Sequence, residues 1–237
     1  MSDARERVIV ALDLPDAESA LETAGALEGA AKLVKVGLTL FASEGPAIVG
    51  RLKGLGFDVF LDLKLHDIPH QVDGAVRSLA ELEPAMLTVH VSGGLDMMRA
   101  AVAAADEAAR ESGKRRPALL GVTVLTSLDA EDLAILGVGR DPAAQVQAMV
   151  RLAHEAGLDG VVCSPREASL ARGILGDDGL VVTPGVRPVW AATDDQVRVA
   201  TPAAALAGGA THLVVGRPVT QALDPSQAFM DVVAEIE

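Results

Sequence analysis

The sequence predicts a single (β/α)8 barrel, the TIM barrel fold, that takes in the whole chain from residue 1 to residue 237. Short apolar runs alternate with alanine-rich segments of helical character from one end of the chain to the other, which is typical of βα units around a parallel sheet. Eight such units in 237 residues match the usual size of a closed barrel. We find no linker, low-complexity segment or charge run that would divide the chain into two domains.

The eight predicted strands are apolar runs whose lengths suit strands better than helices. They cover residues 7–13, 33–38, 58–64, 86–91, 118–125, 160–164, 180–184 and 212–216. The segments between them predict helices at residues 16–27, 45–55, 71–82, 95–111, 142–156, 165–172, 202–207 and 225–236. A doubly wound open sheet is the structural alternative, but the first strand is followed by a carboxylate, Asp13, instead of a Gly-x-Gly-x-x-Gly turn.

The composition argues against several classes of function. A net charge of −13 disfavours nucleic-acid binding, and four Phe, one Trp and no Tyr leave few rings on which bases could stack. No apolar run reaches the roughly 18 to 20 residues of a membrane span, and the first residues lack the pattern of a secretion signal. We therefore expect no membrane segment and a cytoplasmic location. The single cysteine, Cys163, excludes an internal disulfide and a thiolate metal site.

Two charges interrupt the third predicted strand. Asp62 and Lys64 lie two positions apart, so they face the same side of the strand, while the leucines between and beside them face the other side. The simplest interpretation is an ion pair at the end of a buried strand, because buried charges are tolerated when they are paired. Asp67 would then only cap the next helix. Further charges at the ends of other strands favour a functional site instead.

Polar residues occupy the same place in most of the βα units, at or just after the end of the strand. They are Asp13, Lys35, Asp62, Lys64, His90, Thr126, Arg187, Gly216 and Arg217. In a (β/α)8 barrel the carboxyl ends of all strands meet at one rim, where active sites form. We therefore expect these residues to gather at that rim.

Charges of opposite sign alternate among the residues of the first three units. Three carboxylates, of Asp13, Asp62 and Asp67, accompany the ammonium groups of Lys35 and Lys64. Each ammonium can then be flanked by carboxylates, which favour its charged form. A lysine in such surroundings is suited to act as a general acid rather than as a Schiff-base nucleophile, which needs a neutral amine.

Two arginines follow glycine-containing turns at the ends of the seventh and eighth strands. Arg187 ends a Pro-Gly-Val-Arg segment and Arg217 ends Val-Val-Gly-Arg, and barrels commonly bind phosphate at these strand ends. Each arginine alone is compatible with a solvated loop charge, whereas the pair predicts a phosphate site, since a guanidinium offers forked donors to phosphate oxygens. The connection 189–200, which contains Gln196, is long enough to form a lid over that site.

Taken together, these segments resemble orotidine 5'-phosphate decarboxylase of the compact bacterial type over nearly the whole chain. The segments are Ala-Leu-Asp at 11–13, Lys-Val-Gly at 35–37, Asp-Leu-Lys-Leu-His-Asp-Ile-Pro at 62–69, Thr-Val-His at 88–90, Thr-Val-Leu-Thr-Ser at 123–127, Pro-Gly-Val-Arg at 184–187, Asp-Gln at 195–196 and Val-Gly-Arg-Pro at 215–218. The Asp-x-Lys-x-x-Asp element alone marks a wider superfamily that includes sugar-phosphate decarboxylases and hexulose-phosphate synthases. Lys35 favours the nucleotide enzyme, because the metal-dependent relatives carry an acidic residue there.

The resemblance implies decarboxylation of orotidine 5'-phosphate to uridine 5'-phosphate and carbon dioxide, the last step of de novo UMP synthesis, with no metal or organic cofactor. It implies that Lys64 donates a proton to C6 of the pyrimidine, with Asp62 beside the departing carboxylate and Lys35 in the same catalytic set. Asp67 would reach the site of the neighbouring subunit in a homodimer. The substrate-binding residues that it implies are Asp13, Lys35, Asp62, Ile68, Thr126, Arg187, Gln196, Gly216 and Arg217.

Two alternatives stay open. A sugar-phosphate decarboxylase or aldolase on the same barrel would need Mg²⁺ at Asp62 and its neighbours, so excess chelator would remove its activity. A barrel that only binds a phosphorylated ligand gives no reason to bury Lys64 among carboxylates. The sequence assigns no role to the histidines at positions 66, 70, 90 and 154.

Overall fold

The computed structural model describes residues 4–191 and 200–237. Eight strands form one closed parallel barrel in chain order, and β1 completes it by pairing with β8. The strands are β1 (Val8–Ala11), β2 (Leu33–Gly37), β3 (Asp58–Leu65), β4 (Met86–His90), β5 (Ala118–Val122), β6 (Gly160–Val162), β7 (Leu180–Thr183) and β8 (His212–Val215). The predicted (β/α)8 barrel is confirmed.

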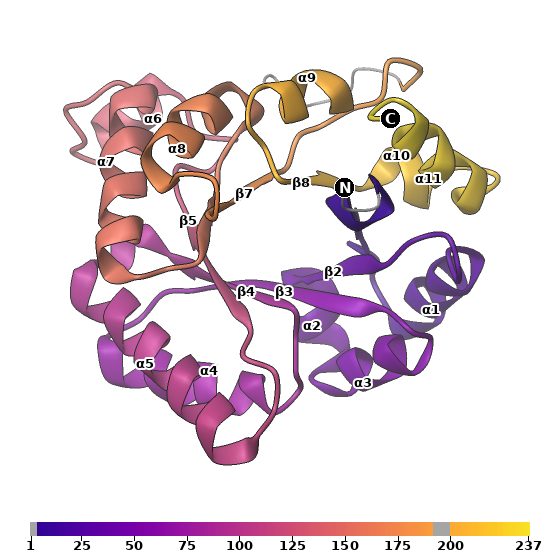
Figure 1. Ribbon diagram of the computed structural model, residues 1–237, viewed down its shortest axis with the longest axis horizontal. Helices are drawn as coiled ribbons and strands as arrows, with labels where there is room; N and C mark the ends of the chain where they lie inside the picture. Colours follow the sequence, from indigo (N-terminus) through magenta and orange to yellow (C-terminus); the bar gives the residue numbers. More distant parts are fainter. Residues whose placement is uncertain (1–3, 192–199) are drawn as a thin grey trace.

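Helices surround the strands as an outer ring (Figure 1). They are α1 (Ala17–Ala26), α2 (Leu38–Glu44), α3 (Ala47–Gly54), α4 (Pro69–Ala80), α5 (Leu95–Ser112), α6 (Ala130–Ile135), α7 (Pro142–Ala156), α8 (Ala168–Leu175), α9 (Pro202–Ala207), α10 (Arg217–Thr220) and α11 (Pro225–Ala234). Short 3-10 turns cover Ala4–Arg7, Val91–Gly93 and Pro165–Glu167. No helix within the described ranges is both long and apolar enough to cross a membrane.

Three helices begin at the prolines where the sequence predicted their starts. The first residues of α7, α9 and α11 are prolines, and each follows a capping residue whose side chain accepts a backbone N–H from the first turn. Asp141, Thr201 and Asp224 are these caps. Proline suits this place because it has no N–H to leave unsatisfied and its φ already fits a helix.

Several predicted boundaries are wrong. The helix predicted at 45–55 is preceded by an unpredicted helix, α2, and Gly45 and Pro46 separate the two, with Gly45 in the left-handed region at a φ of 63°. The helix predicted at 165–172 opens as a 3-10 turn and continues as α8. The fifth strand ends at Val122 rather than residue 125, and the following connection contains α6, which the sequence analysis did not predict.

Apolar side chains fill both faces of the barrel wall, as expected for parallel strands that are covered on both sides. Most strands contribute at least one buried apolar side chain to the inner face. These side chains include Ile9, Leu33, Phe60, Met86, Leu120, Val182 and Val214. A larger cluster fills the space between the strands and the helices. Because alternate residues share a face, the residues two positions after these inner ones lie on the same inner face, nearer the carboxyl rim of the barrel.

Candidate active site

Near the carboxyl rim, the side chains on the inner face of the barrel change from apolar to polar. Lys35 follows Leu33 by two positions, and Asp62 follows Phe60 by two positions, so both side chains lie above apolar residues of the barrel interior. Asp13 continues the inner face of β1 beyond its last paired residue. The strand period therefore brings these three side chains together, as the sequence predicted.

Alternating charges connect four of these side chains, Asp13, Lys35, Asp62 and Lys64, which we call the charge network. The ammonium nitrogen of Lys35 lies 2.8 Å from Oδ1 of Asp13 and 3.5 Å from Oδ2 of Asp62. The ammonium nitrogen of Lys64 lies 2.9 Å from Oδ1 of Asp62. The side chain of Lys35 is only 8% exposed and that of Asp62 only 14%, so their pairing compensates the loss of hydration.

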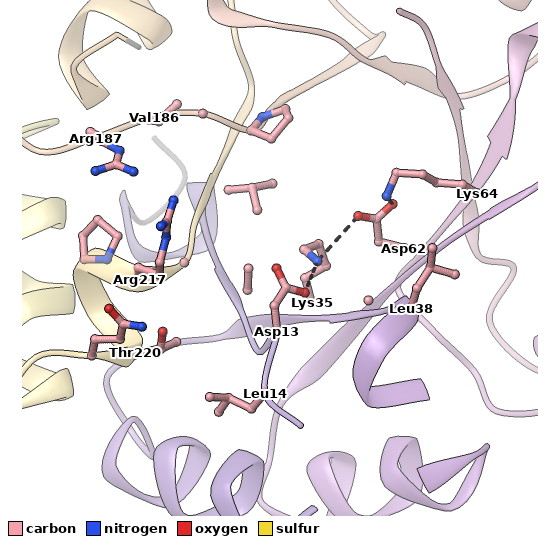
Figure 2. Close-up of a pocket in the computed structure, with 18 residues that line it drawn as sticks. Asp13, Leu14, Lys35, Leu38, Asp62, Lys64, Val186, Arg187, Arg217 and Thr220 are labelled. Carbon is pink, nitrogen blue, oxygen red and sulfur yellow. Dashed lines mark hydrogen bonds and ion pairs between the residues drawn. The ribbon is translucent and has the colours of Figure 1, made fainter. Parts of the chain in front are cut away.

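A cavity of about 520 Å³ opens above the charge network. Arg187, Gly216 and Arg217 line it together with the network, and Figure 2 shows both arginines on one side of the cavity and the charge network on the other. Gly216 and Arg217 lie at the start of α10, where backbone N–H groups lack acceptors within the helix. The cavity thus offers cationic donors at one end and paired charges at the other.

The connection after β7 begins beside this cavity, and backbone contacts join its first residues to its last. Gly185 turns the chain with a φ of 76°, and Val186 then forms a parallel bridge with Ala200. The N–H of Arg187 donates to the carbonyl of Ala200 at 3.0 Å, and the Arg187 residue is 6% exposed. The predicted lid, residues 189–200, falls largely outside the described residues, and so does Gln196.

A second, smaller cavity of about 180 Å³ shares part of the charge network and is otherwise mostly apolar. Lys35, Asp62 and Lys64 face it on one side, and Thr126 lines it with side chains such as Phe60. The other apolar lining residues are Val122, Val124, Leu125, Val162, Cys163, Pro184 and Val214. Burial raises the pKa of the Cys163 thiol to about 12, so it behaves here as a small apolar group.

Asp67 and Ile68 lie near the charge network in the sequence but do not line either cavity of this chain. Both are exposed; Ile68 retains 62% of its accessible surface, and Oδ1 of Asp67 accepts the N–H of Ile68 at 2.6 Å. Their predicted roles in catalysis and substrate binding therefore stay predictions.

The histidine rings of His66 and His90 lie next to each other, with centroids 5.3 Å apart. Nδ1 of His90 is the one buried side-chain nitrogen or oxygen in the described part of the chain without a hydrogen-bond partner. Burial lowers the pKa of His90, and the nearby His66 and Lys64 lower it further. Neither ring lines the two cavities. His70 and His154 are exposed, so the structure adds no role for them.

Two further residues of the site received no role from the sequence. The hydroxyl of Thr88 accepts the backbone N–H of Lys64 at 2.8 Å and lies 3.2 Å from Oδ1 of Asp62. Gly37 lies so close to the charge network that a β-carbon there would collide with it. A signal for Thr88 exists in the sequence, since it is a polar residue two positions beyond the interior Met86.

Fold and site together define an enzyme of the (β/α)8-barrel class, with its site at the carboxyl ends of the strands. The model of the Orotidine 5'-phosphate decarboxylase / HUMPS family matches residues 6–232. The chain belongs to this family, which confirms the predicted resemblance and, at the level of the family, the predicted classification as a carboxy-lyase.

Individual relatives match almost from end to end. An orotidine 5'-phosphate decarboxylase of Pseudomonas putida is 50% identical over 236 residues, which cover 100% of this chain and 99% of the relative. One of Chromohalobacter salexigens is 48% identical over 232 residues, which cover 97% and 95%. The crystal structure of orotidine 5'-phosphate decarboxylase from Lactobacillus acidophilus superposes with a TM-score of 0.86 at 38% identity, covering 98% of this chain and 99% of that one.

Proposed function

We propose that this chain decarboxylates orotidine 5'-phosphate to uridine 5'-phosphate and carbon dioxide, the last step of UMP synthesis, without a metal ion or organic cofactor. The observation that carries the proposal is the Asp62–Lys64 pair, 2.9 Å apart in a cavity that also contains Arg187 and Arg217. Relatives that are 48% to 50% identical and bear the name of this enzyme support it. A cytoplasmic location fits a step of nucleotide synthesis and stays part of the proposal.

The two cavities match the three parts of such a nucleotide. Arg187, Gly216 and Arg217 are suited to hold the phosphate, because they supply guanidinium and backbone donors at the ends of β7 and β8. Asp13 and Lys35 border the middle of the larger cavity and suit the ribose hydroxyls. The smaller apolar cavity suits the flat pyrimidine, with Thr126 as a polar contact. Gln196 enters only through the family resemblance, as a further phosphate contact.

The chemistry needs a fixed cation at C6. When the bond between C6 and the carboxylate breaks, its electron pair stays on C6, which has no adjacent carbonyl to accept it. An ammonium held at that carbon stabilises the negative charge without reorganising at the moment of reaction. We assign this part to Lys64, which then transfers a proton from Nζ to C6 and later regains one from water. Asp62 lies beside the departing carboxylate in this scheme, and Lys35 holds Asp62 in place.

The metal-dependent alternative fits the site less well. Oδ1 of Asp62 faces the ammonium of Lys64 and Oδ2 faces that of Lys35, so a cation would have to displace lysine nitrogens from both oxygens. In the described part of the chain, no three His, Cys, Asp or Glu side chains are grouped closely enough to hold a metal ion. Sugar-phosphate chemistry at Mg²⁺ is therefore the second candidate.

We also propose a homodimer in which Asp67 completes the site of the neighbouring subunit. Asp67 lies two residues after the end of the strand that carries Asp62 and Lys64, yet it lines neither of the two cavities described above. Exposed apolar side chains surround the same rim, with Ile68 62% exposed and Leu38 59% exposed. Burial of such side chains against a second copy would remove apolar surface from water.

An absorbance assay tests the proposed function. The purified protein should consume orotidine 5'-phosphate and release uridine 5'-phosphate and carbon dioxide in equal amounts, at the same rate with and without excess EDTA. Loss of activity in EDTA, with recovery on adding Mg²⁺, would favour the metal-dependent alternative. Failure to consume the substrate under either condition would refute the proposal.

A further inference from the structure

Thr88 contacts the main chain of Lys64 directly and is linked to the ammonium of Lys64 through Asp62. It occupies the middle of β4, is completely buried, and faces the barrel interior above Met86. Its hydroxyl oxygen accepts the backbone N–H of Lys64 at 2.8 Å. The same hydroxyl donates to Oδ1 of Asp62 at 3.2 Å, and this oxygen also accepts from Nζ of Lys64 at 2.9 Å. The three residues therefore form a closed ring of hydrogen bonds.

An irregularity in the sheet explains why a side chain is needed here. Leu61 pairs with Leu87 and Leu65 pairs with Val89, so the three residues from 62 to 64 lie opposite the single residue Thr88. A bulge of this kind interrupts the regular ladder and leaves backbone groups to be satisfied in another way. The Thr88 hydroxyl takes the place of the missing carbonyl acceptor for Lys64.

The backbone of Lys64 is also strained. Its φ of 53° lies in the left-handed region, which residues with a β-carbon rarely adopt. Such a conformation persists where the surroundings hold it, and it is concentrated at functional sites. The bond from its N–H to Thr88 is one of the contacts that hold it.

We propose that Thr88 is a positioning residue for the decarboxylation, a proposal that rests on the proposed function. Its hydroxyl fixes the main chain of Lys64 and the carboxylate of Asp62 at the same time, and so fixes where the ammonium of Lys64 stands. Without the hydroxyl, Oδ1 of Asp62 loses one of the two donors that it has among the described residues, and the ammonium is less well aimed at C6. Misplacement of a reacting group by an ångström is enough for a large loss of rate.

A purely structural role makes a different prediction. If the hydroxyl served only to satisfy a buried N–H and to join β3 to β4, its loss would lower the stability of the protein but leave the turnover of folded molecules unchanged. The kcat of fully folded protein therefore separates the two roles, because only a positioning role lowers it.

The test compares Thr88→Val, which keeps the shape but removes the hydroxyl, with Thr88→Ser, which keeps the hydroxyl. Thr211→Val is the matched control, because the Thr211 hydroxyl likewise accepts a backbone N–H and donates to a backbone carbonyl, both of Val181, at the opposite end of the barrel. All variants are assayed with orotidine 5'-phosphate at a temperature where circular dichroism shows them folded. Binding of uridine 5'-phosphate is measured by calorimetry.

We expect T88V to lower kcat at least about tenfold, with KM and product binding nearly unchanged, and T88S to restore most of kcat. T211V should lose stability but keep wild-type kcat. A folded T88V with wild-type kcat would overturn the role of Thr88 alone, and so would a T88S variant as slow as T88V. A wild-type protein that leaves orotidine 5'-phosphate unchanged would instead overturn the proposed function, and this proposal with it.

Discussion

Gly37 leaves room for the carboxylate of Asp13, because a β-carbon at position 37 would lie 2.6 Å from Oδ1 of Asp13. The same β-carbon would lie 2.9 Å from Nζ of Lys35, which Asp13 holds at 2.8 Å. The φ of Gly37 is −95°, a value that any residue can adopt. Gly37 is therefore required for space beside the charge network and not for its backbone conformation.

Gly37→Ala should impair activity more than stability. The added methyl group has to push the ends of two flexible side chains aside, which costs little folding energy but displaces the groups proposed to bind the ribose. We expect kcat/KM to fall at least about tenfold and Tm to change by no more than about 2 °C. Gly50→Ala is the control, since nothing lies within 4 Å of a β-carbon on that exposed helical residue. Equal kcat/KM in both variants would contradict the assigned role.

Lys64→Ala should abolish turnover while nucleotide binding survives. In the proposed mechanism the ammonium stabilises and protonates C6, whereas the arginines proposed to bind the phosphate lie on the other side of the cavity (Figure 2). We expect kcat to fall by at least about 10³-fold, with the Kd for uridine 5'-phosphate changed far less. Lys53→Ala is the control, because Lys53 pairs with Glu83 at 3.0 Å and lines neither cavity. Appreciable turnover by Lys64→Ala would count against Lys64 as proton donor.

Arg217→Ala should act mainly through the phosphate. Loss of charge-assisted hydrogen bonds to phosphate predicts a rise in KM of about 10- to 100-fold. The variant and the wild type should use orotidine, which lacks the phosphate, equally poorly, because the deleted group then has no partner. Arg151→Ala, on the exposed face of α7, should behave like the wild type. An unchanged KM for orotidine 5'-phosphate would remove Arg217 from the phosphate site.

The dimer proposal predicts that two inactive variants restore each other. Lys64→Ala and Asp67→Asn should each be inactive alone. After subunit exchange, half of the dimers are mixed and each mixed dimer has one intact site, so about one quarter of the wild-type activity should return. Sedimentation has to show that exchange took place. Mixed dimers without activity would place Asp67 in the site of its own chain, and an Asp67→Asn variant that is active alone would place it outside catalysis.

The sequence predicted the barrel and the charge network because both follow from simple periods. Alternation along a strand places Asp62 and Lys64 on one face, and barrel closure brings Asp13 and Lys35 to the same rim. Neither inference requires knowing how any two strands are aligned.

The parts that were missed depend on geometry that no period contains. Thr88 meets Lys64 only because β3 shifts register against β4 between Leu61 and Leu65. Gly37 matters only because of where two side-chain ends lie. Asp67 is a different case, because the sequence analysis gave it a role only through the family resemblance, and its role in a neighbouring subunit stays a proposal.

His212 should make the protein sensitive to acid at a distance from the active site. Its ring lies at the amino end of β8, where Nδ1 is 2.9 Å from Oγ1 of Thr211. Burial, together with the charge of Arg7, lowers the pKa of His212 from its ordinary 6.5 to about 4. The folded protein therefore resists protonation of a ring that the unfolded chain protonates readily.

The sign of the effect follows from proton linkage. Between pH 6.5 and pH 4 the unfolded state binds more protons at this residue, so stability is fully present above that range and falls as the pH drops through it. His212 should contribute about 2 kcal/mol to the loss in the free energy of unfolding between pH 8 and pH 5. Urea denaturation of His212→Gln at both pH values should show a loss smaller by about that amount, whereas His154→Gln, on the exposed end of α7, should match the wild type. An undiminished loss in His212→Gln would mean that other groups carry the acid sensitivity.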